Sequence, residues 1–322
     1  MQAHQGFDRD KGISRRDFFK AMTCLGAGMA SLSLHPLLAA IPEPMPSIPR
    51  RMLGKTGLKV SLLGVGGLGV VCDSTDKDLV EKYLHTAADA GINFFDTAAN
   101  YGKEGQSEKN LALIMGTPRR KDLILATKCE DRSYDGAMKQ VETSLERMKT
   151  DRLDIIQVHY VSVKDDVKTF GSATGVLTAL RKLRDQKVVN FIGLTGHADF
   201  PQVKEALALY DWDTFMCFVN PSRFCRPVFE EQLPLAQKKQ MGIIAMKTLG
   251  GSPAPLVEKG KVDVSTLLRF AWDSPVHTAI PGMDSLNQLQ ENIATARTYK
   301  PMTPDERQAL IAAVNQGKPW RM

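Results

Sequence analysis

The stretch Asn93-Phe94-Phe95-Asp96-Thr97-Ala98-Ala99-Asn100-Tyr101-Gly102 decides the fold of this 322-residue chain. It begins as a short apolar strand that ends at Asp96, and Tyr101 follows on the next loop. The next apolar run ends at Lys128, and the one after it ends at His159. Buried ionisable groups need partners, so three consecutive runs that end in this way predict one shared site for Asp96, Tyr101, Lys128 and His159.

Outward from this stretch, apolar strand-like runs alternate with stretches of helical periodicity, at intervals of roughly thirty residues, typical of β–α units. The predicted strands are residues 60–65, 93–98, 123–128, 154–159, 190–195, 214–220, 242–247 and 278–281. The predicted helices are residues 73–91, 108–115, 136–148, 175–186, 201–210, 227–240, 263–272 and 285–297. This alternation predicts a parallel (β/α)8 TIM barrel of the α/β class. A β-hairpin over residues 51–60 precedes it, and an extra helix over residues 305–314 follows it.

In such barrels, catalytic groups lie at the carboxyl ends of the strands, where Asp96, Lys128 and His159 are predicted. An ammonium about 4 Å from the Tyr101 oxygen favours the phenolate by ~4 kcal/mol, about three pKa units, before burial and Asp96 oppose it. Asp96 in turn keeps Lys128 charged. We therefore expect Tyr101 to exchange a proton with a carbonyl oxygen near neutral pH, while His159 orients that oxygen.

The candidate site contains no activated nucleophile, so hydride transfer from a bound nicotinamide fits it better than hydrolysis. Two alternatives stay open. A Schiff-base lyase would use Lys128 as an amine nucleophile, but it needs a neutral lysine, which Asp96 opposes. A non-catalytic, nicotinamide-binding or regulatory barrel is the second alternative, because a fold does not determine a function.

At these residues the chain resembles the aldo-keto reductase family, from Arg51 to about Arg297. Residues 51–61 resemble the family's opening hairpin, and residues 95–108 resemble the signature of its second strand. Residues 144–159 are similar to the run that leads into its fourth strand. The resemblance implies reduction of an aldehyde or ketone to the alcohol by NAD(P)H. It also implies that the catalytic residues are Asp96, Tyr101, Lys128 and His159, with Tyr101 as the proton donor.

The resemblance also implies a set of cofactor-binding positions, several of which depart from the family pattern. Thr195-Gly196 stands where members often carry Ser-Asn, and Met216 stands where a Gln is usual. Gly282, Met283 and Gln288 stand where NADPH-preferring members carry cationic or hydroxyl groups, so NADP(H) is expected and NAD(H) is possible. The cofactor-binding positions are Gly66, Gly67, Asp96, Thr195, Gly196, Met216, Met246, Lys247, Pro281, Gly282, Met283, Gln288, Glu291 and Asn292.

Residues 64–69 match G-x-G-x-x-G after a strand, but a further segment separates these glycines from the helix, so a bend at the barrel mouth is the better interpretation. Five cysteines without a closely spaced pair predict no metal site, and the chain lacks the terminal cysteine cluster of relatives that hold an iron–sulfur cluster. One disulfide stays possible. A net charge of +6, from interspersed charges, predicts no nucleic-acid partner.

Before the barrel, the run Ser14-Arg15-Arg16-Asp17-Phe18-Phe19-Lys20 precedes a mildly apolar segment, residues 21–40. This pattern looks like a twin-arginine export signal. Glycine, serine and Pro36 interrupt the segment, so we expect no stable membrane anchor. The predicted organisation is a signal over 1–40, a Pro-rich linker over 41–50 and the barrel over 51–322. The expected partners are the twin-arginine export machinery and a small carbonyl substrate. A periplasmic or exported location follows, with the cytoplasm as the alternative.

Overall fold

The computed structural model describes residues 46–197, 201–251, 254–258 and 262–316. Its eight parallel strands are hydrogen-bonded to their neighbours in chain order. The seam between the first and last strands is joined as well, because the Gly64 amide donates to the Ala279 oxygen and the Ala279 amide donates to the Leu62 oxygen, both at 2.9 Å. The predicted (β/α)8 barrel is confirmed. The strands are β3 (Val65–Gly66), β4 (Phe94–Asp96), β5 (Ile124–Cys129), β6 (Leu153–Val161), β7 (Val189–Gly196), β8 (Thr214–Phe218), β9 (Gly242–Met246) and β10 (Thr278–Ile280).

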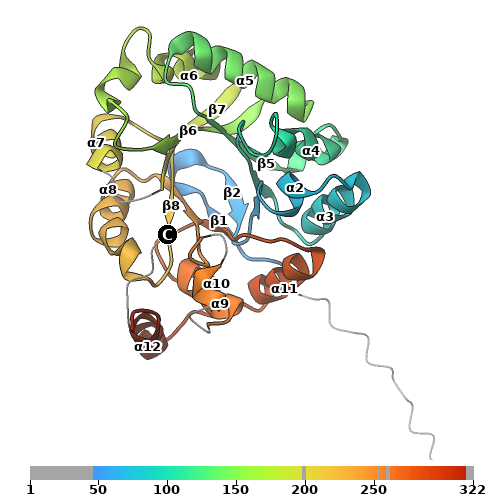
Figure 1. Cartoon of the computed structure of the whole chain (residues 1–322), viewed down its shortest axis with the longest axis vertical. Helices are drawn as coiled ribbons and strands as arrows, with labels where there is room; N and C mark the ends of the chain where they lie inside the picture. The colour runs from blue at the N-terminus through green and yellow to red at the C-terminus, as the bar shows by residue number, and fades with distance from the viewer. Residues whose placement is uncertain (1–45, 198–200, 252–253, 259–261, 317–322) are drawn as a thin grey trace, which may run out of the picture. The chain divides into compact units, whose positions relative to one another are not determined.

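Helices surround the strands, as the view along the barrel shows (Figure 1). Side-chain caps begin several of them: Ser133, Asp263 and Ser285 each accept a backbone amide of the first turn. The main helices are α3 (Lys77–Asp89), α4 (Gln106–Met115), α5 (Tyr134–Met148), α6 (Val176–Asp185), α7 (Pro201–Leu209), α8 (Leu233–Lys238), α10 (Val264–Trp272), α11 (Leu286–Arg297) and α12 (Pro304–Val314). The shorter turns are α2 (Val70–Asp73), α9 (Pro255–Glu258), η2 (Pro118–Asp122), η3 (Val167–Gly171), η4 (Arg223–Cys225) and η5 (Val228–Gln232).

The predicted hairpin consists of the antiparallel strands β1 (Arg50–Met52) and β2 (Lys59–Ser61), joined through η1 (Gly54–Thr56). Leu53 and Val60 are fully buried and pack in one cluster with residues of the barrel interior, including Phe94. The hairpin therefore contributes to the barrel's inner core. Gly54 is required there, because its φ is +51° and an added Cβ would lie 2.3 Å from the backbone nitrogen of Gly242.

Two predicted boundaries were wrong. Residues 60–65 do not form one strand: β2 ends at Ser61, and β3 begins at Val65. The Ser61 hydroxyl donates to the Leu63 oxygen at 2.6 Å, and this local bond accompanies the turn from the hairpin into the barrel. The helix predicted to open near Asp73 is α3, which Asp76 caps instead by accepting the amides of Asp78 and Leu79.

Within the described ranges, no helix combines the length and the apolar character needed to cross a membrane. The predicted export signal, residues 1–40, lies outside the described residues.

Candidate active site

An ion pair lies at the base of the site, where the carboxyl ends of β4 and β5 meet. Lys128 Nζ donates to Asp96 Oδ2 and, at 2.6 Å, to the backbone oxygen of Thr97. Gln157 Nε2 donates to the other Asp96 oxygen at 3.0 Å. Burial alone would lower the pKa of Lys128, but Asp96 and Tyr101 outweigh burial and raise it. Lys128 therefore stays charged, which opposes the Schiff-base alternative.

Tyr101 lies beside this ion pair, with its ring centroid 4.9 Å from Lys128 Nζ. Burial is the largest influence on the phenol and raises its pKa, and the charge of Asp96 acts in the same direction. Lys128 lowers the pKa of Tyr101 but does not overcome burial, so the pKa is raised overall. The expectation that Lys128 lowers the pKa of this phenol overall is therefore wrong for this state. A protonated Tyr101 is suited to donate a proton.

His159, near the end of β6, completes the predicted group of four. Its ring centroid is 5.9 Å from that of Tyr101, and its side chain is nearly buried. Burial, followed by the charges of Lys128, His197 and Arg132, lowers the pKa of His159 to about 2, so its imidazole is neutral. Nδ1 lies 3.3 Å from the Glu130 carboxylate, but it makes no hydrogen bond with the described residues.

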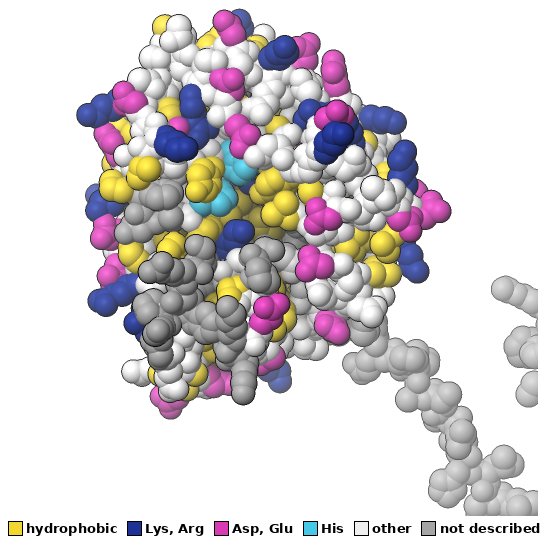
Figure 2. All heavy atoms as spheres, viewed as in Figure 1, with side chains coloured by type: hydrophobic (Ala, Val, Ile, Leu, Met, Phe, Trp, Pro, Cys, Tyr) yellow, Lys and Arg dark blue, Asp and Glu magenta, His cyan; other side chains and the backbone are white. Residues whose placement is uncertain are grey.

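The structure thus brings all four predicted catalytic residues to one end of the barrel. Figure 2 shows histidine side chains in the hollow at the centre of this face, next to hydrophobic side chains. A charged lysine, a protonated phenol and a neutral imidazole can together stabilise, protonate and orient a carbonyl oxygen.

Buried residues that the sequence analysis did not assign hold this group in place. Glu108 is fully buried and accepts from Thr127 at 2.8 Å and from Arg147 at 3.1 Å. Arg147 also donates to the Ala99 oxygen at 3.0 Å, which ties helices α4 and α5 to the Tyr101 loop. The position of Gln157 could have been predicted from the sequence. Alternate residues of a strand share a face, and Gln157 lies two positions before His159.

Several predicted cofactor positions are engaged in packing or hydrogen bonds within the protein. A Cβ on Gly67 would lie 2.6 Å from the Ser107 hydroxyl oxygen, so this glycine allows a close approach of two loops. The Thr195 hydroxyl accepts the Tyr160 amide at 2.6 Å. Met216 is fully buried in the barrel interior, where Met246 is also buried. Gly66 ends β3, and Gly196 ends β7.

The loop after β9 has the features of a phosphate-binding segment. Lys247 is half-buried, burial lowers its pKa, and it has no ion pair with the described residues. The neighbouring Thr248 hydroxyl is buried and has no hydrogen-bond partner among the residues that the structure describes. Gly250 and Gly251 follow with φ of +95° and +121°. A cation, an unpaired hydroxyl and a glycine turn suit the pyrophosphate of a nicotinamide dinucleotide, although Thr248 was not predicted from the sequence.

The turn between β10 and α11 carries no cation, since residues 281–292 contain neither lysine nor arginine. Its Gln288 side chain accepts the Asp284 amide at 2.7 Å. Arg297, at the other end of α11, donates to the Ala90 oxygen at 3.4 Å. The remaining predicted positions vary in exposure: Pro281, Met283 and Asn292 are buried, whereas Gly282 and Glu291 are exposed.

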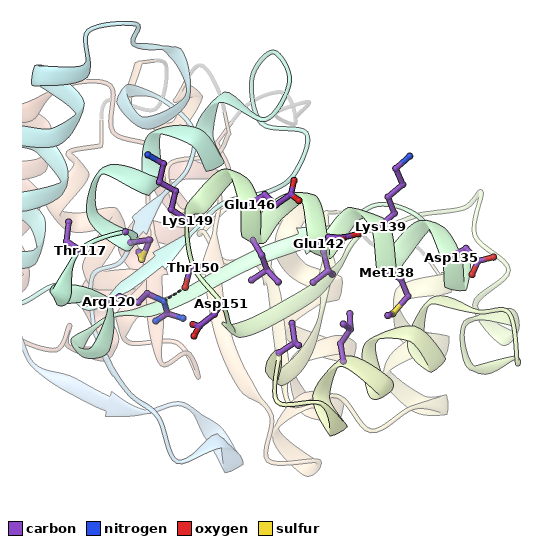
Figure 3. A pocket seen from close by; sticks show the side chains of 16 residues that line it. Thr117, Arg120, Asp135, Met138, Lys139, Glu142, Glu146, Lys149, Thr150 and Asp151 are labelled. Atoms are coloured by element: carbon purple, nitrogen blue, oxygen red, sulfur yellow. Dashed lines mark hydrogen bonds between the residues drawn. The ribbon is translucent and has the colours of Figure 1, made fainter.

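A groove of about 1150 Å³ lies elsewhere, on the outer surface along α5 (Figure 3). Its lining includes Arg120, Glu142 and Leu183 but none of the four predicted catalytic residues, so it is not the active site. In the part of the chain that the structure describes, no group of three or more histidine, cysteine or acidic side chains is placed to hold a metal ion. The cysteines described there are free thiols, namely Cys72, Cys129, Cys217 and Cys225.

Comparisons with known proteins agree with this geometry. A family model described as the aldo/keto reductase family matches residues 62–261. The chain is 29% identical over 307 residues to L-galactose dehydrogenase from Arabidopsis thaliana, covering 81% of this chain and 92% of that protein. It is 26% identical over 258 residues to D-threo-aldose 1-dehydrogenase from a Pseudomonas species, covering 69% of this chain and 77% of that protein.

Two solved structures are similar to this chain. The holo form of an aldo-keto reductase from Bacillus halodurans has a TM-score of 0.70 at 22% identity, covering 85% of this chain and 98% of that one. A putative aldo-keto reductase from Pseudomonas aeruginosa has a TM-score of 0.63 at 28% identity, covering 78% and 96%. The first of these similarities supports the fold alone.

Proposed function

Because this chain belongs to the aldo/keto reductase family, we propose that it reduces an aldehyde or ketone to the alcohol with NAD(P)H, and that Tyr101 donates the proton. One observation carries the assignment to Tyr101: its phenol lies beside the buried Lys128–Asp96 pair and next to His159. The phenol, the ion pair and the imidazole are together the groups that protonation of a carbonyl oxygen needs.

A bound nicotinamide would supply the hydride to the carbonyl carbon. Neutral His159 donates a hydrogen bond to the carbonyl oxygen and so orients it. Tyr101 passes its proton to that oxygen as negative charge develops there. The positive charge of Lys128 stabilises the phenolate that remains, and Asp96 keeps Lys128 charged. Solvent then returns a proton to Tyr101, which restores the starting state.

Lys247 and Thr248 are the residues that would hold the phosphates of the dinucleotide, because they offer a cation and a hydroxyl that has no partner among the described residues. We propose NADP(H) as the modest favourite, with NAD(H) also accepted. The absence of lysine and arginine from residues 281–292 supports weak discrimination between the two.

Two of the relatives are named for the oxidation of L-galactose and of aldoses. These names support a small, sugar-like carbonyl compound as the substrate of this chain. They also support reversibility, since the same proton and hydride transfers then run in the opposite direction.

Replacing Tyr101 with Phe tests the assignment, because this change keeps the ring and removes the hydroxyl that carries the transferable proton. We expect aldehyde reduction, followed by the loss of NADPH absorbance, to fall by about 10²–10⁴-fold. The dissociation constant for NADPH, from fluorescence quenching, should stay nearly unchanged. Tyr134→Phe on α5 is the matched control and should behave like the unmodified protein. Unaltered turnover in Tyr101→Phe would contradict the proposed role.

We also propose that residues 1–40 direct the folded protein into the twin-arginine export pathway, and that it works in the periplasm or outside the cell. The motif around Arg15-Arg16 supports this location. A barrel that folds around its nicotinamide before export suits a route that carries folded proteins.

A further inference from the structure

His197 follows directly after β7, at the same end of the barrel as the catalytic residues. Its ring centroid lies 5.5 Å from that of His159, 4.7 Å from that of Tyr160 and 5.9 Å from that of Phe218. Three neighbouring rings therefore hold this imidazole in a defined orientation, next to the histidine that orients the carbonyl oxygen.

The polar atoms of His197 are not used by the described part of the protein. Its Nδ1 is enclosed and has no hydrogen-bond partner there, whereas the ring as a whole is part-exposed. Burial, followed by the charges of Lys128 and Lys247, lowers the pKa of His197 to about 3, so the imidazole is neutral. Because no described partner on Nδ1 fixes the tautomer, Nε2 can either donate or accept a hydrogen bond.

A hydroxyl group both donates and accepts hydrogen bonds, so it matches an imidazole whose tautomer is free. The aromatic rings beside His197 add apolar surface that suits the C–H groups of the same compound. Phe218 contacts both His197 and Phe224, with ring centroids 6.0 Å apart in the second pair. Apolar ring surface next to a neutral hydrogen-bonding group suits a compound that carries both C–H and O–H groups.

We propose that His197 is a substrate-binding residue, which hydrogen-bonds a hydroxyl group close to the reacting carbonyl. His197 thereby selects hydroxylated aldehydes and ketones over simple ones. This inference rests on the proposed function, since it takes Tyr101 and His159 to hold the carbonyl oxygen.

The test compares two aldehydes of equal carbon number, glyceraldehyde and propanal, which differ in their hydroxyl groups. The quantity measured is the ratio of kcat/KM for glyceraldehyde to kcat/KM for propanal. This ratio does not depend on the fraction of enzyme that is folded and active, so a partly unstable variant still gives a result. The dissociation constant for NADPH is measured alongside it.

His197→Phe keeps an aromatic ring but removes both nitrogens, and we expect it to lower the ratio by about tenfold. His197→Gln loses the ring but keeps a donor and an acceptor, and should retain more of the ratio than His197→Phe. Both should bind NADPH as the unmodified enzyme does. The matched control is His85→Phe on α3, where the histidine lies 3.9 Å from Glu81 on the helix surface, and its ratio should not change.

An unchanged ratio in His197→Phe, with both aldehydes still reduced, would overturn this inference and leave the proposed function intact. A loss of NADPH binding with an unchanged ratio would overturn it as well, because His197 would then hold the cofactor. Failure of the unmodified protein to reduce either aldehyde would overturn the proposed function, and this inference with it.

Discussion

Burial and the ammonium of Lys128 act in opposite directions on the pKa of Tyr101, and the balance between them sets the chemistry of the site. Burial and Asp96 raise the pKa of the phenol, and the ammonium of Lys128 lowers it less than they raise it. The phenol therefore keeps its proton until a carbonyl oxygen takes it. Once the proton has moved, the same ammonium stabilises the phenolate, so Lys128 matters more in the transition state than in the resting enzyme.

Lys128→Met removes that ammonium and leaves Asp96 buried without a cation. We expect carbonyl reduction to fall by more than about 100-fold. Residual alcohol oxidation, which needs the phenolate, should move to higher pH, because the pKa of Tyr101 rises further. Breaking a buried pair from one side should also lower the free energy of unfolding by about 3 kcal/mol. Rate profiles against pH and urea unfolding measure these changes.

The control for this prediction is the double variant Lys128→Met/Asp96→Asn. It removes the uncompensated carboxylate, so we expect it to recover most of the stability and none of the activity. A double variant as unstable as the single one would show that the ion pair contributes to stability in another way.

At the scale of elements, the pairing of β6 with β7 positions His159 and His197. The register of this strand pair shifts between Val158 and Val161, and Tyr160 within the shift has a φ of +50°. The Thr195 hydroxyl on β7 accepts the Tyr160 amide and so stabilises this irregular backbone. Arg132 adds a second support by donating to the His159 oxygen at 2.6 Å.

Thr195→Val keeps the shape of the side chain but leaves the Tyr160 amide without its acceptor. We expect the free energy of unfolding to fall by about 1 kcal/mol, because a part-buried amide loses this hydrogen bond. Aldehyde reduction should fall too, since the backbone next to His159 is less well held. Thr195→Ser keeps the hydroxyl and is the matched control in urea unfolding and in kinetics. Equal losses in the valine and serine variants would show that the Thr195 methyl group matters rather than its hydroxyl.

We expect the turn from β10 to α11 to set the preference of this chain between NADPH and NADH. The 2′-phosphate of NADPH calls for cationic or hydrogen-bonding partners, and the turn offers an exposed Asp284 and a Gln288 already bonded to it. We expect dissociation constants for NADPH and NADH within roughly tenfold of each other, with NADPH the tighter ligand. Titrations at low and high salt measure both.

Gln288→Arg supplies a cation at this turn and should raise the preference for NADPH by about tenfold, with an effect that weakens in high salt. Gln288→Met is the neutral comparison. A preference for NADPH above about a hundredfold in the unmodified protein would mean that another cationic group binds the phosphate, and that the turn does not decide selectivity.

At the scale of the whole molecule, the residues that close and stabilise the barrel are different from the residues of the candidate active site. The hairpin packs Leu53 and Val60 into the inner core, and the Gly64–Ala279 hydrogen bond joins the first and last strands. The ionisable groups lie at the carboxyl ends of β4, β5 and β6, where loops of different length can shape a substrate site without disturbing that core.

We expect export of the whole protein to depend on the two arginines of the predicted signal. Replacing Arg15 and Arg16 with lysine should keep the protein in the cytoplasm, because a twin-arginine address is read by a receptor rather than by its charge. Cell fractionation with immunoblotting measures the distribution, and replacing Lys11 with arginine, outside the motif, is the control. Unchanged export of the double lysine variant would rule out this pathway.

The sequence by itself determined the barrel and its four central residues. Apolar runs alternating with helical periods leave few other packings, and an ionisable residue at the end of a buried run reveals a strand end. Only the tertiary structure decided the protonation of Tyr101, since burial depends on neighbours distant in the chain. It also brought Gln157 to Asp96, Thr195 to Tyr160 and His197 to His159, because contacts across strands depend on register and loop geometry, which local sequence patterns do not specify.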